Sequence, residues 1–150
     1  MFGVMNNPAA AYRKAGLETQ IDTANPHQLV LMLFTGAITA ISSAAQHMAA
    51  QFKATGLDAM EVAKKAEEIS RAIDIIDRGL KACLDQQAGG ELSERLAALY
   101  EYMCNRLLTA NLRNDQAALE EVKSLLIELK GAWEEIAADP AVVSDSRKVA

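Results

Sequence analysis

Four stretches of this chain repeat apolar residues at alternating intervals of three and four, and glycine, proline or helix-capping residues stand between them. This spacing puts the apolar side chains on one face of an α-helix, whereas no stretch alternates as a strand would. Because one-sided helices bury their apolar faces against each other, the pattern predicts an all-α fold. The short connections favour an antiparallel up-and-down four-helix bundle.

The first two helices are expected to start at polar caps. Asn25 precedes Pro26 and Gln28, a combination typical of a capped helix start, and Gly56 should end this helix. The apolar face of the first helix is expected to comprise Val30, Phe34, Ala37, Ile41, Ala44, Met48 and Phe52. Asp58 and Glu61 form a predicted cap at the start of the second helix, and Gly89-Gly90 is expected to end it. The second apolar face is expected to comprise Val62, Ala66, Ile69, Ile73, Ile76, Leu80 and Cys83.

The third helix is expected from Glu91 to Asn111, and Asp115 is the predicted N-cap of the fourth, which Asp139-Pro140 closes. The third apolar face comprises Leu92, Leu96, Leu99, Met103, Leu107 and Ala110. The fourth comprises Leu119, Val122, Leu126, Leu129, Trp133 and Ile136, so the tryptophan is expected to face the interior. The chain is therefore interpreted as a mobile N-terminal arm (residues 1–24), a helical bundle (25–139) and a disordered tail (140–150).

Composition excludes several classes of protein. The formal net charge is −5 at pH 7, which disfavours nucleic-acid binding and attraction to an anionic membrane. No run of about 18 apolar residues and no basic, apolar leader occurs, so we expect a cytoplasmic protein without direct membrane insertion. Cys83 and Cys104 lie on different predicted helices and are interpreted as reduced thiols.

Two enzyme-like bundles were considered as alternatives. A di-metal bundle needs Glu-x-x-His pairs on two helices, but neither His27 nor His47 follows an acidic residue at that spacing. A phosphotransfer bundle needs an exposed histidine with a lysine on the same face. Lys53 is six positions beyond His47, a spacing that puts the lysine on a different face of a helix. The chain also lacks a phosphate-binding glycine loop and a nucleophile motif. No catalytic, cofactor or metal site is predicted, and no cofactor is expected.

Some large apolar residues lie outside the four apolar faces. Residues 29–34, including Leu31, are all apolar and would point in every direction from a helix. Ile38, Ile75, Leu108 and Ile127 lie to the side of their helices' apolar faces. Isolated exposed apolar residues are ordinary, but such residues on all four helices favour a groove for a partner's amphipathic helix. The arm also carries apolar residues, and we expect these to cover part of that groove when no partner is bound: Tyr12, Leu17 and Ile21.

Several short motifs occur in order along the chain. Residues 12–38 (YRKAGLETQIDTANPHQLVLMLFTGAI) contain an arm tyrosine, a Pro-His-Gln-Leu helix start and a Leu-Phe-x-Gly-Ala turn. Residues 72–85 (AIDIIDRGLKACLD), 89–91 and 99–115 (LYEYMCNRLLTANLRND) follow, and an Ala-Trp pair ends at Trp133. Together they resemble the flagellar export chaperones of the FliS family over residues 12–136. The sequence departs at Thr35, where the family commonly has an acidic residue, so no acidic role is assigned there.

The resemblance implies a cytosolic chaperone rather than an enzyme. It implies binding of the C-terminal segment of flagellin, protection from premature polymerisation, and delivery to the flagellar type III export apparatus, with the export gate as a further partner. The residues expected to contact flagellin are Tyr12, Leu17, Ile21, Leu31, Ile38, Ile75, Leu108 and Ile127. A helical adaptor for another secretion substrate or regulator remains the alternative.

Overall fold

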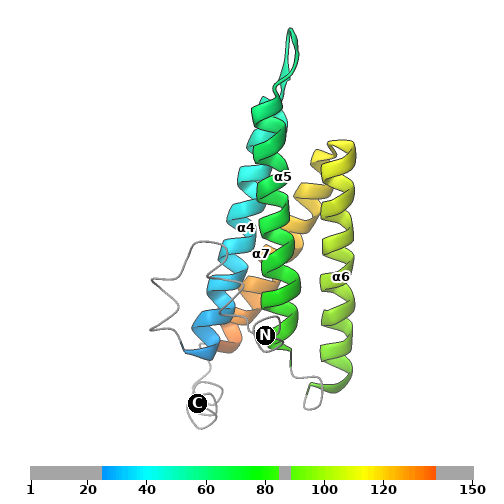
Figure 1. Cartoon of the computed structure of the whole chain (residues 1–150). Coiled ribbons are helices and arrows are strands. Elements are labelled where there is room, and N and C mark those ends of the chain that lie inside the picture. The colour runs from blue at the N-terminus through cyan, green and yellow to red at the C-terminus, as the bar shows by residue number, and fades with distance from the viewer. Residues whose placement is uncertain (1–24, 85–88, 138–150) are drawn as a thin grey trace, which may run out of the picture.

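The computed structural model describes residues 25–84 and 89–137, which fold into four long helices packed as a bundle (Figure 1). These are α4 (Pro26–Ala50), α5 (Ala59–Asp74), α6 (Gly90–Arg113) and α7 (Gln116–Ala137). The helix of α5 continues through a π turn, η1 (Ile75–Leu80), and a 3₁₀ turn, η2 (Lys81–Cys83). The prediction of an all-α bundle is confirmed.

Neighbouring helices run in opposite directions, as polar contacts between α4 and α7 illustrate. At the start of α7, the Gln116 side chain donates to the carbonyl oxygen of Ala45, late in α4, at 3.1 Å. Near the end of α7, Trp133 Nε1 donates to the carbonyl oxygen of His27, at the start of α4, also at 3.1 Å. Figure 1 shows α5 and α6 beside this pair, each antiparallel to the helix before it.

The predicted caps form as expected. Asn25 and Gln28 make a reciprocal pair, with the Gln28 amide 2.8 Å from Asn25 Oδ1 and the Asn25 amide 3.2 Å from Gln28 Oε1. Asp58 accepts hydrogen bonds from the first amides of α5, and Asp115 accepts one from an amide of α7. These side chains satisfy amides that have no partner within the helix, so the helix starts are fixed locally.

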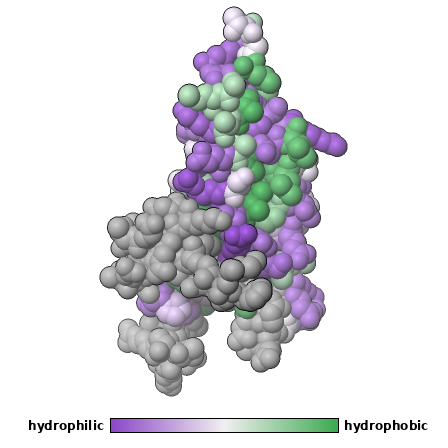
Figure 2. Space-filling model, viewed as in Figure 1, coloured by the Kyte–Doolittle hydropathy of each residue, from purple (hydrophilic) through white to green (hydrophobic). Residues whose placement is uncertain are grey.

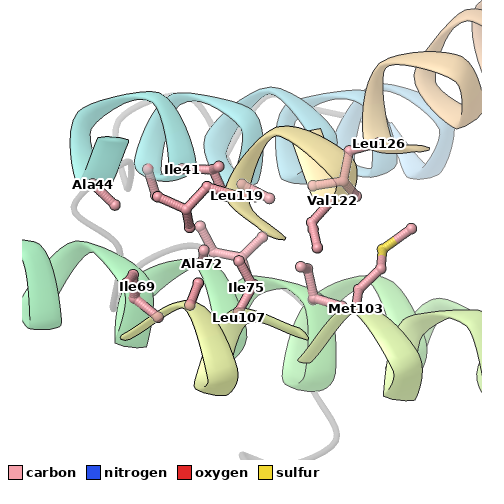
Figure 3. Close-up of a cluster of buried hydrophobic side chains, with 14 of the residues drawn as sticks. Ile41, Ala44, Ile69, Ala72, Ile75, Met103, Leu107, Leu119, Val122 and Leu126 are labelled. Carbon is pink, nitrogen blue, oxygen red and sulfur yellow. The ribbon is translucent and has the colours of Figure 1, made fainter. Parts of the chain in front are cut away.

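The core follows the predicted apolar faces along most of the bundle. Figure 3 shows side chains from all four helices pointing toward one another between the ribbons. Its labelled residues are Ile41, Ala44, Ile69, Ala72, Ile75, Met103, Leu107, Leu119, Val122 and Leu126, each of which is completely buried. Burying a large aliphatic side chain contributes about 1.5–3 kcal/mol, so this cluster dominates the stability of the bundle.

The connection between α4 and α5 differs from the prediction. The first helix ends at Ala50 rather than near Gly56, and a short hairpin of β1 (Phe52–Lys53) and β2 (Gly56–Leu57) projects beyond the bundle (Figure 1). Gly56 has φ of 123°, a conformation that favours glycine and allows the tight turn. Phe52, which was expected in the core, is 59% exposed because it belongs to this hairpin.

The π turn overturns the prediction that Ile75 contacts a client. The amide of Lys81 bonds to the carbonyl of Ile76, five residues earlier, so the helix is locally wider than an α-helix. This turn packs against both α4 and α6, and Ile75 and Ile76 are both 0% exposed although they are adjacent in sequence. Ile75 is therefore a core residue that no partner can reach in the folded bundle.

The apolar faces also become less buried toward one end of the bundle. Leu92 is 66% exposed and Ile136 is 45% exposed, although both continue predicted apolar faces. Trp133 is only partly buried, and Tyr100, which was not expected in the core, is 4% exposed. The described part of the second helix ends at Cys83, earlier than predicted. Exposed leucine and isoleucine at this end result from a cavity between the helices there.

The helix α4 is long and apolar enough to cross a membrane by length and composition, and it is the one such helix among the described residues. It packs against both α5 and α7, and eight of its residues are buried in the bundle. The core helix of a helical bundle has the same composition, so its hydropathy is accounted for by this packing.

Candidate functional site: an apolar pocket at one end of the bundle

All four helices contribute to a pocket of about 230 Å³ at the end of the bundle opposite the hairpin, here called the end pocket. The start of α4, the last turns of the α5 helix, the first half of α6 and the last half of α7 form its walls. Its lining residues are Val30, Phe34, Leu80, Cys83, Leu84, Leu92, Leu96, Tyr100, Leu129, Ala132, Trp133 and Ile136. The walls are almost entirely apolar, which suits an apolar side chain better than a polar small molecule.

The rim of the end pocket exposes large apolar side chains. Leu92 stands on α6 and Ile136 on α7, and both line the pocket while remaining accessible to solvent. Neither side chain gains the full benefit of burial in the isolated bundle, so covering them with another apolar surface would be favourable. The pocket and its rim therefore form a continuous site for a partner.

Trp133 ties the two chain segments that frame the end pocket. Its ring lies against the His27 ring with 5.0 Å between the centroids, and its indole N–H donates to the His27 backbone oxygen. His27 Nδ1 is buried and has no hydrogen-bond partner among residues 25–84 and 89–137. The tryptophan thus joins the last turns of α7 to the first turn of α4 and also supplies part of the pocket wall.

Burial suppresses acid–base chemistry in this site. It raises the pKa of Cys83 from 9.0 to about 11 and that of Tyr100 from 10.0 to about 12, with the neighbouring Cys83 a smaller influence on Tyr100. Both groups therefore keep their protons at neutral pH. A protonated thiol is a weak nucleophile, so the residues that line the pocket suit binding better than covalent catalysis.

The opposite end of the bundle is held by polar contacts instead. Lys65, only 3% exposed, donates to Asn114 Oδ1 at 2.6 Å and to the carbonyl oxygen of Asn111 at 3.0 Å. Gln51 Nε2 donates to the same Asn114 oxygen at 2.7 Å, so the ends of α4 and α6 and a residue inside α5 meet at one side chain. Desolvation lowers the pKa of Lys65. We interpret this cluster as a structural clamp.

His47, the histidine considered for phosphotransfer, makes a structural contact. Its Nδ1 lies 2.5 Å from Glu61 Oε2, and this pair joins the end of α4 to the start of α5. Among residues 25–84 and 89–137, no three His, Cys, Asp or Glu side chains gather in a way that would hold a metal ion.

Comparison with known proteins identifies the family. The family model described as "Flagellar protein FliS" matches residues 6–140. The flagellar secretion chaperone FliS of Salmonella typhimurium is 46% identical over 126 residues, which cover 84% of this chain and 87% of that protein. The flagellar secretion chaperone FliSB of Pseudomonas aeruginosa is 38% identical, covering 83% and 91% of the two chains. The Bacillus subtilis FliS chaperone is 34% identical, covering 87% and 86%.

The chain belongs to the FliS family of flagellar secretion chaperones. Membership covers both ends of the bundle, so the end pocket and the clamp are parts of a FliS fold rather than of an added domain. The relatives compared above are each named as chaperones, in agreement with a site built for binding.

The FliS fold places the predicted client contacts unevenly. Leu108 and Ile127 are each 50% exposed, as expected of contact residues. Leu31 and Ile38 are half-buried, with Ile38 packed against the core, and Ile75 is inaccessible. The remaining three predicted contacts lie outside the described residues: Tyr12, Leu17 and Ile21.

A second apolar area lies on the outer face of the FliS bundle. Figure 2 shows apolar surface over the parts of α5 and α6 nearest the hairpin. In the second half of α6, Leu108 is exposed and Leu112 is 82% exposed. This area and the end pocket are separate, so a partner that covered both would have to extend along the bundle.

Sequence reasoning missed the end pocket because its lining looks like core. Phe34, Leu80 and Leu129 line the pocket, but in the sequence they belong to the same periodic apolar faces as the residues of the fully buried core. The spacing reports which way a side chain points, but it does not report whether an opposing side chain reaches it. A weak signal was available at Leu92, because it directly follows a Gly-Gly-Glu break and lies at the first turn of its helix.

Proposed function

We propose that this chain is a cytoplasmic chaperone that binds the C-terminal segment of flagellin. Binding would keep that segment from polymerising before export and help deliver it to the flagellar type III export apparatus, with the export gate as a second partner. The observation that carries the proposal is the apolar end pocket with exposed leucine and isoleucine at its rim, in a member of a secretion chaperone family.

The shape of the apolar surface supports an extended, amphipathic client. One apolar area is the end pocket, and another lies on the outer face near Leu108 and Leu112. A helical or extended segment can place apolar residues in both areas at once, whereas a compact globular surface cannot enter the pocket. A client that orders only on binding loses conformational entropy at that moment, which keeps its affinity moderate and permits release.

Binding should be measured by calorimetry with flagellin and with flagellin that lacks its C-terminal segment. Leu92→Glu and Ile136→Glu place a charge at the exposed rim and should weaken binding of the full-length protein by about tenfold or more. Leu57→Glu is the matched control, because Leu57 is 61% exposed in the hairpin at the opposite end of the bundle. Equal binding of both flagellins, or equal loss in all three variants, would contradict the proposal.

The predicted contacts Leu108 on α6 and Ile127 on α7 are tested with the same assay. Leu108→Glu and Ile127→Glu change side chains that are each 50% exposed, so the thermal midpoint should stay close to that of the parent. Weaker flagellin binding by Leu108→Glu would place the client on the outer face, and weaker binding by Ile127→Glu would place it on α7. If both variants bind flagellin normally, the client engages the end pocket alone.

We also propose that the N-terminal arm covers the client site in the free protein. Residues 1–24 join the bundle at Asn25, close to the Trp133–His27 contact at the end pocket. The arm carries Tyr12, Leu17 and Ile21, and the residues that follow it, 29–34, are all apolar. Covering this surface would reduce self-association of the free chaperone.

Deleting residues 1–17 separates two roles for the arm. If the arm is a displaceable cover, flagellin should bind equally or more tightly and the free chaperone should aggregate more. If the arm clamps the client or engages the export gate, binding or secretion should fall. Unchanged binding, secretion and aggregation would show that the arm has neither role.

A second candidate function is a helical adaptor for another secretion substrate or regulator. The same pocket and rim would serve such a partner, since apolar lining selects for side-chain size rather than for a particular protein. Binding of flagellin that does not depend on its C-terminal segment would favour this alternative.

A further inference from the structure

Leu33 of α4 packs directly against Gly79 in the π turn. Leu33 is completely buried, and a β-carbon at position 79 would lie 2.8 Å from Leu33 Cδ2 and 3.3 Å from Leu33 Cδ1. The backbone of Gly79 is not in the left-handed region, so its conformation does not require glycine. The absent side chain is therefore explained by the space that the leucine occupies.

This contact lies directly beside the end pocket. The next residues along the two helices, Phe34 and Leu80, both line the pocket, and Cys83 follows one turn later on the same wall. The contact between Leu33 and Gly79 therefore fixes how closely α4 approaches the end of the α5 helix at the point where both form the pocket wall. Gly79 lies within the π turn η1, and the 3₁₀ turn η2 follows directly.

We propose that the packing of Leu33 against Gly79 sets the width of the end pocket and thereby the largest client side chain that it accepts. Gly79 is then a positioning residue, because it acts on the client through the separation of two walls. The inference about client size rests on the proposed function, whereas the inference about width does not.

Adding one methyl group should widen the pocket. In Gly79→Ala the leucine must retreat by about half an ångström or more before its carbon atoms reach van der Waals separation. Leu33 is fully buried, and a packed interior transmits such a displacement to the neighbouring helix. We expect Val30 and Phe34 to move away from Leu80 and Cys83 as a result.

The width can be measured at Cys83 without flagellin. Cys104→Ala leaves Cys83 as the one thiol, because the chain has two cysteines. In this background, the thiolate attacks the sulfenyl sulfur of a methanethiosulfonate, forms a mixed disulfide and releases methanesulfinate. The rates with the methyl and the benzyl reagent are compared, so that changes in the thiol pKa cancel in the ratio.

Gly79→Ala should raise the benzyl-to-methyl rate ratio by about threefold or more, because space for one methylene alters discrimination in an apolar pocket by about tenfold. Gly131→Ala is the matched control: Gly131 is an exposed glycine in α7, and an added β-carbon there meets nothing within 4 Å. It should leave the ratio unchanged. An unchanged ratio in Gly79→Ala, or an equal rise in both variants, would overturn the proposal.

The rescue variant tests the contact itself. Leu33→Val removes the two δ-carbons that a residue at position 79 would meet, so Leu33→Val with Gly79→Ala should restore the parental ratio. If Gly79→Ala alone does not fold, this double variant decides: a parental ratio supports the proposal, and a changed ratio overturns it.

Flagellin binding provides a separate readout. Calorimetry with the C-terminal segment should show affinity reduced about fivefold or more by Gly79→Ala and recovered in the double variant. If the parent does not bind the segment at all, the proposed function fails while the rate ratio still decides the width. If the parent binds it and Gly79→Ala changes the ratio but not the affinity, the inference about client size is wrong.

Discussion

The two ends of this bundle are built from the same kind of helix but are closed in different ways. Near the hairpin, apolar side chains meet in the centre, and Asn114 at the end of α6 joins Lys65 of α5 to Gln51 at the end of α4. At the other end, the same apolar faces surround an end pocket, and rim residues such as Leu92 stay exposed. The comparison separates an end that is closed by packing and polar contacts from an end that leaves apolar surface accessible.

The difference follows from what occupies the centre of each end. Completely buried residues such as Ile41, Ile69 and Leu119 pack together in the half of the bundle nearer the hairpin. At the pocket end, the Trp133 indole N–H donates a hydrogen bond to the carbonyl oxygen of His27, and the small residue Ala132 forms part of the pocket lining. Apolar surface at this end is therefore available to a partner.

The largest effect is expected from truncating a leucine at the closed end. Leu119→Ala removes a completely buried side chain and should lower the free energy of unfolding by about 2–5 kcal/mol. Leu92→Ala, the same change at the exposed rim of the pocket, should lower it by less than about 1 kcal/mol. Urea denaturation followed by circular dichroism measures both. Equal losses would show that the pocket end supports the fold as much as the closed end does.

The clamp should give the next largest effect. Asn114 has φ of 52°, which glycine adopts freely, so Asn114→Gly removes the side-chain acceptor while keeping the backbone. The substitution removes the hydrogen bond of 2.6 Å between Lys65 Nζ and Asn114 Oδ1, so the buried ammonium of Lys65 loses one partner. The free energy of unfolding should fall by about 2–3 kcal/mol.

Asn114→Asp is the control for this prediction. It keeps the acceptor oxygen and places a negative charge beside Lys65, so stability should remain near that of the parent or increase. If Asn114→Gly and Asn114→Asp are equally stable, the clamp does not hold the closed end together.

The pKa of Cys83 reports whether water is excluded from the end pocket. Burial raises the pKa of Cys83 from 9.0 to about 11, so the thiol ionises first in the unfolded chain. Its contribution to stability is complete below pH 9 and is lost as the pH rises to about 11, with a total of about 2 kcal/mol. In a Cys104→Ala background, thiolate absorbance gives the pKa of Cys83 directly, and urea denaturation between pH 8 and 11 gives the linked loss.

The matched comparison removes the remaining thiol. A Cys83→Ala, Cys104→Ala chain should lose less stability over the same pH range. Lys65 works in the opposite direction, because its lowered pKa adds stability as the pH rises toward 10.5. A Cys83 pKa close to 9 in the folded protein would mean that water fills the end pocket and that the two ends differ less than proposed.

Local features of the fold could be predicted from the sequence, while features that depend on tertiary contacts could not. Asn25, Asp58 and Asp115 cap helices as predicted because a cap involves only residues within one turn. The burial of Ile75 was not predicted because η1 packs against both α4 and α6, and the spacing of residues within one helix does not report how many neighbouring helices surround it.

The candidate site was only partly predictable for a related reason. The exposure of Leu108 and Ile127 could be predicted because an apolar residue outside a periodic face is visible in the sequence, while their contact with a client stays a prediction. The end pocket was not found because Leu80 and Leu129 follow the core pattern, and a cavity depends on the distance between helices. Gly79 would have been the best clue, since a glycine inside an apolar helix face indicates close approach of a neighbour.

The smallest expected effect concerns the bond that frames the pocket. Trp133→Phe keeps an aromatic ring in the pocket wall but removes the indole N–H that donates to the His27 oxygen at 3.1 Å. Because a neutral hydrogen bond contributes about 1 kcal/mol, the free energy of unfolding should fall by about that amount. Trp133→Ala also removes the ring, so it should lower the free energy of unfolding further. The loss should be smaller than for a fully buried tryptophan, because Trp133 is only partly buried.

If Trp133→Phe is neutral and Trp133→Ala alone weakens flagellin binding, the ring acts as a pocket wall and the hydrogen bond to His27 adds nothing to the stability of the fold. If both changes lower stability by several kcal/mol without affecting binding, Trp133 belongs to the core, and the boundary between the folding end and the binding end lies closer to the tip of the bundle.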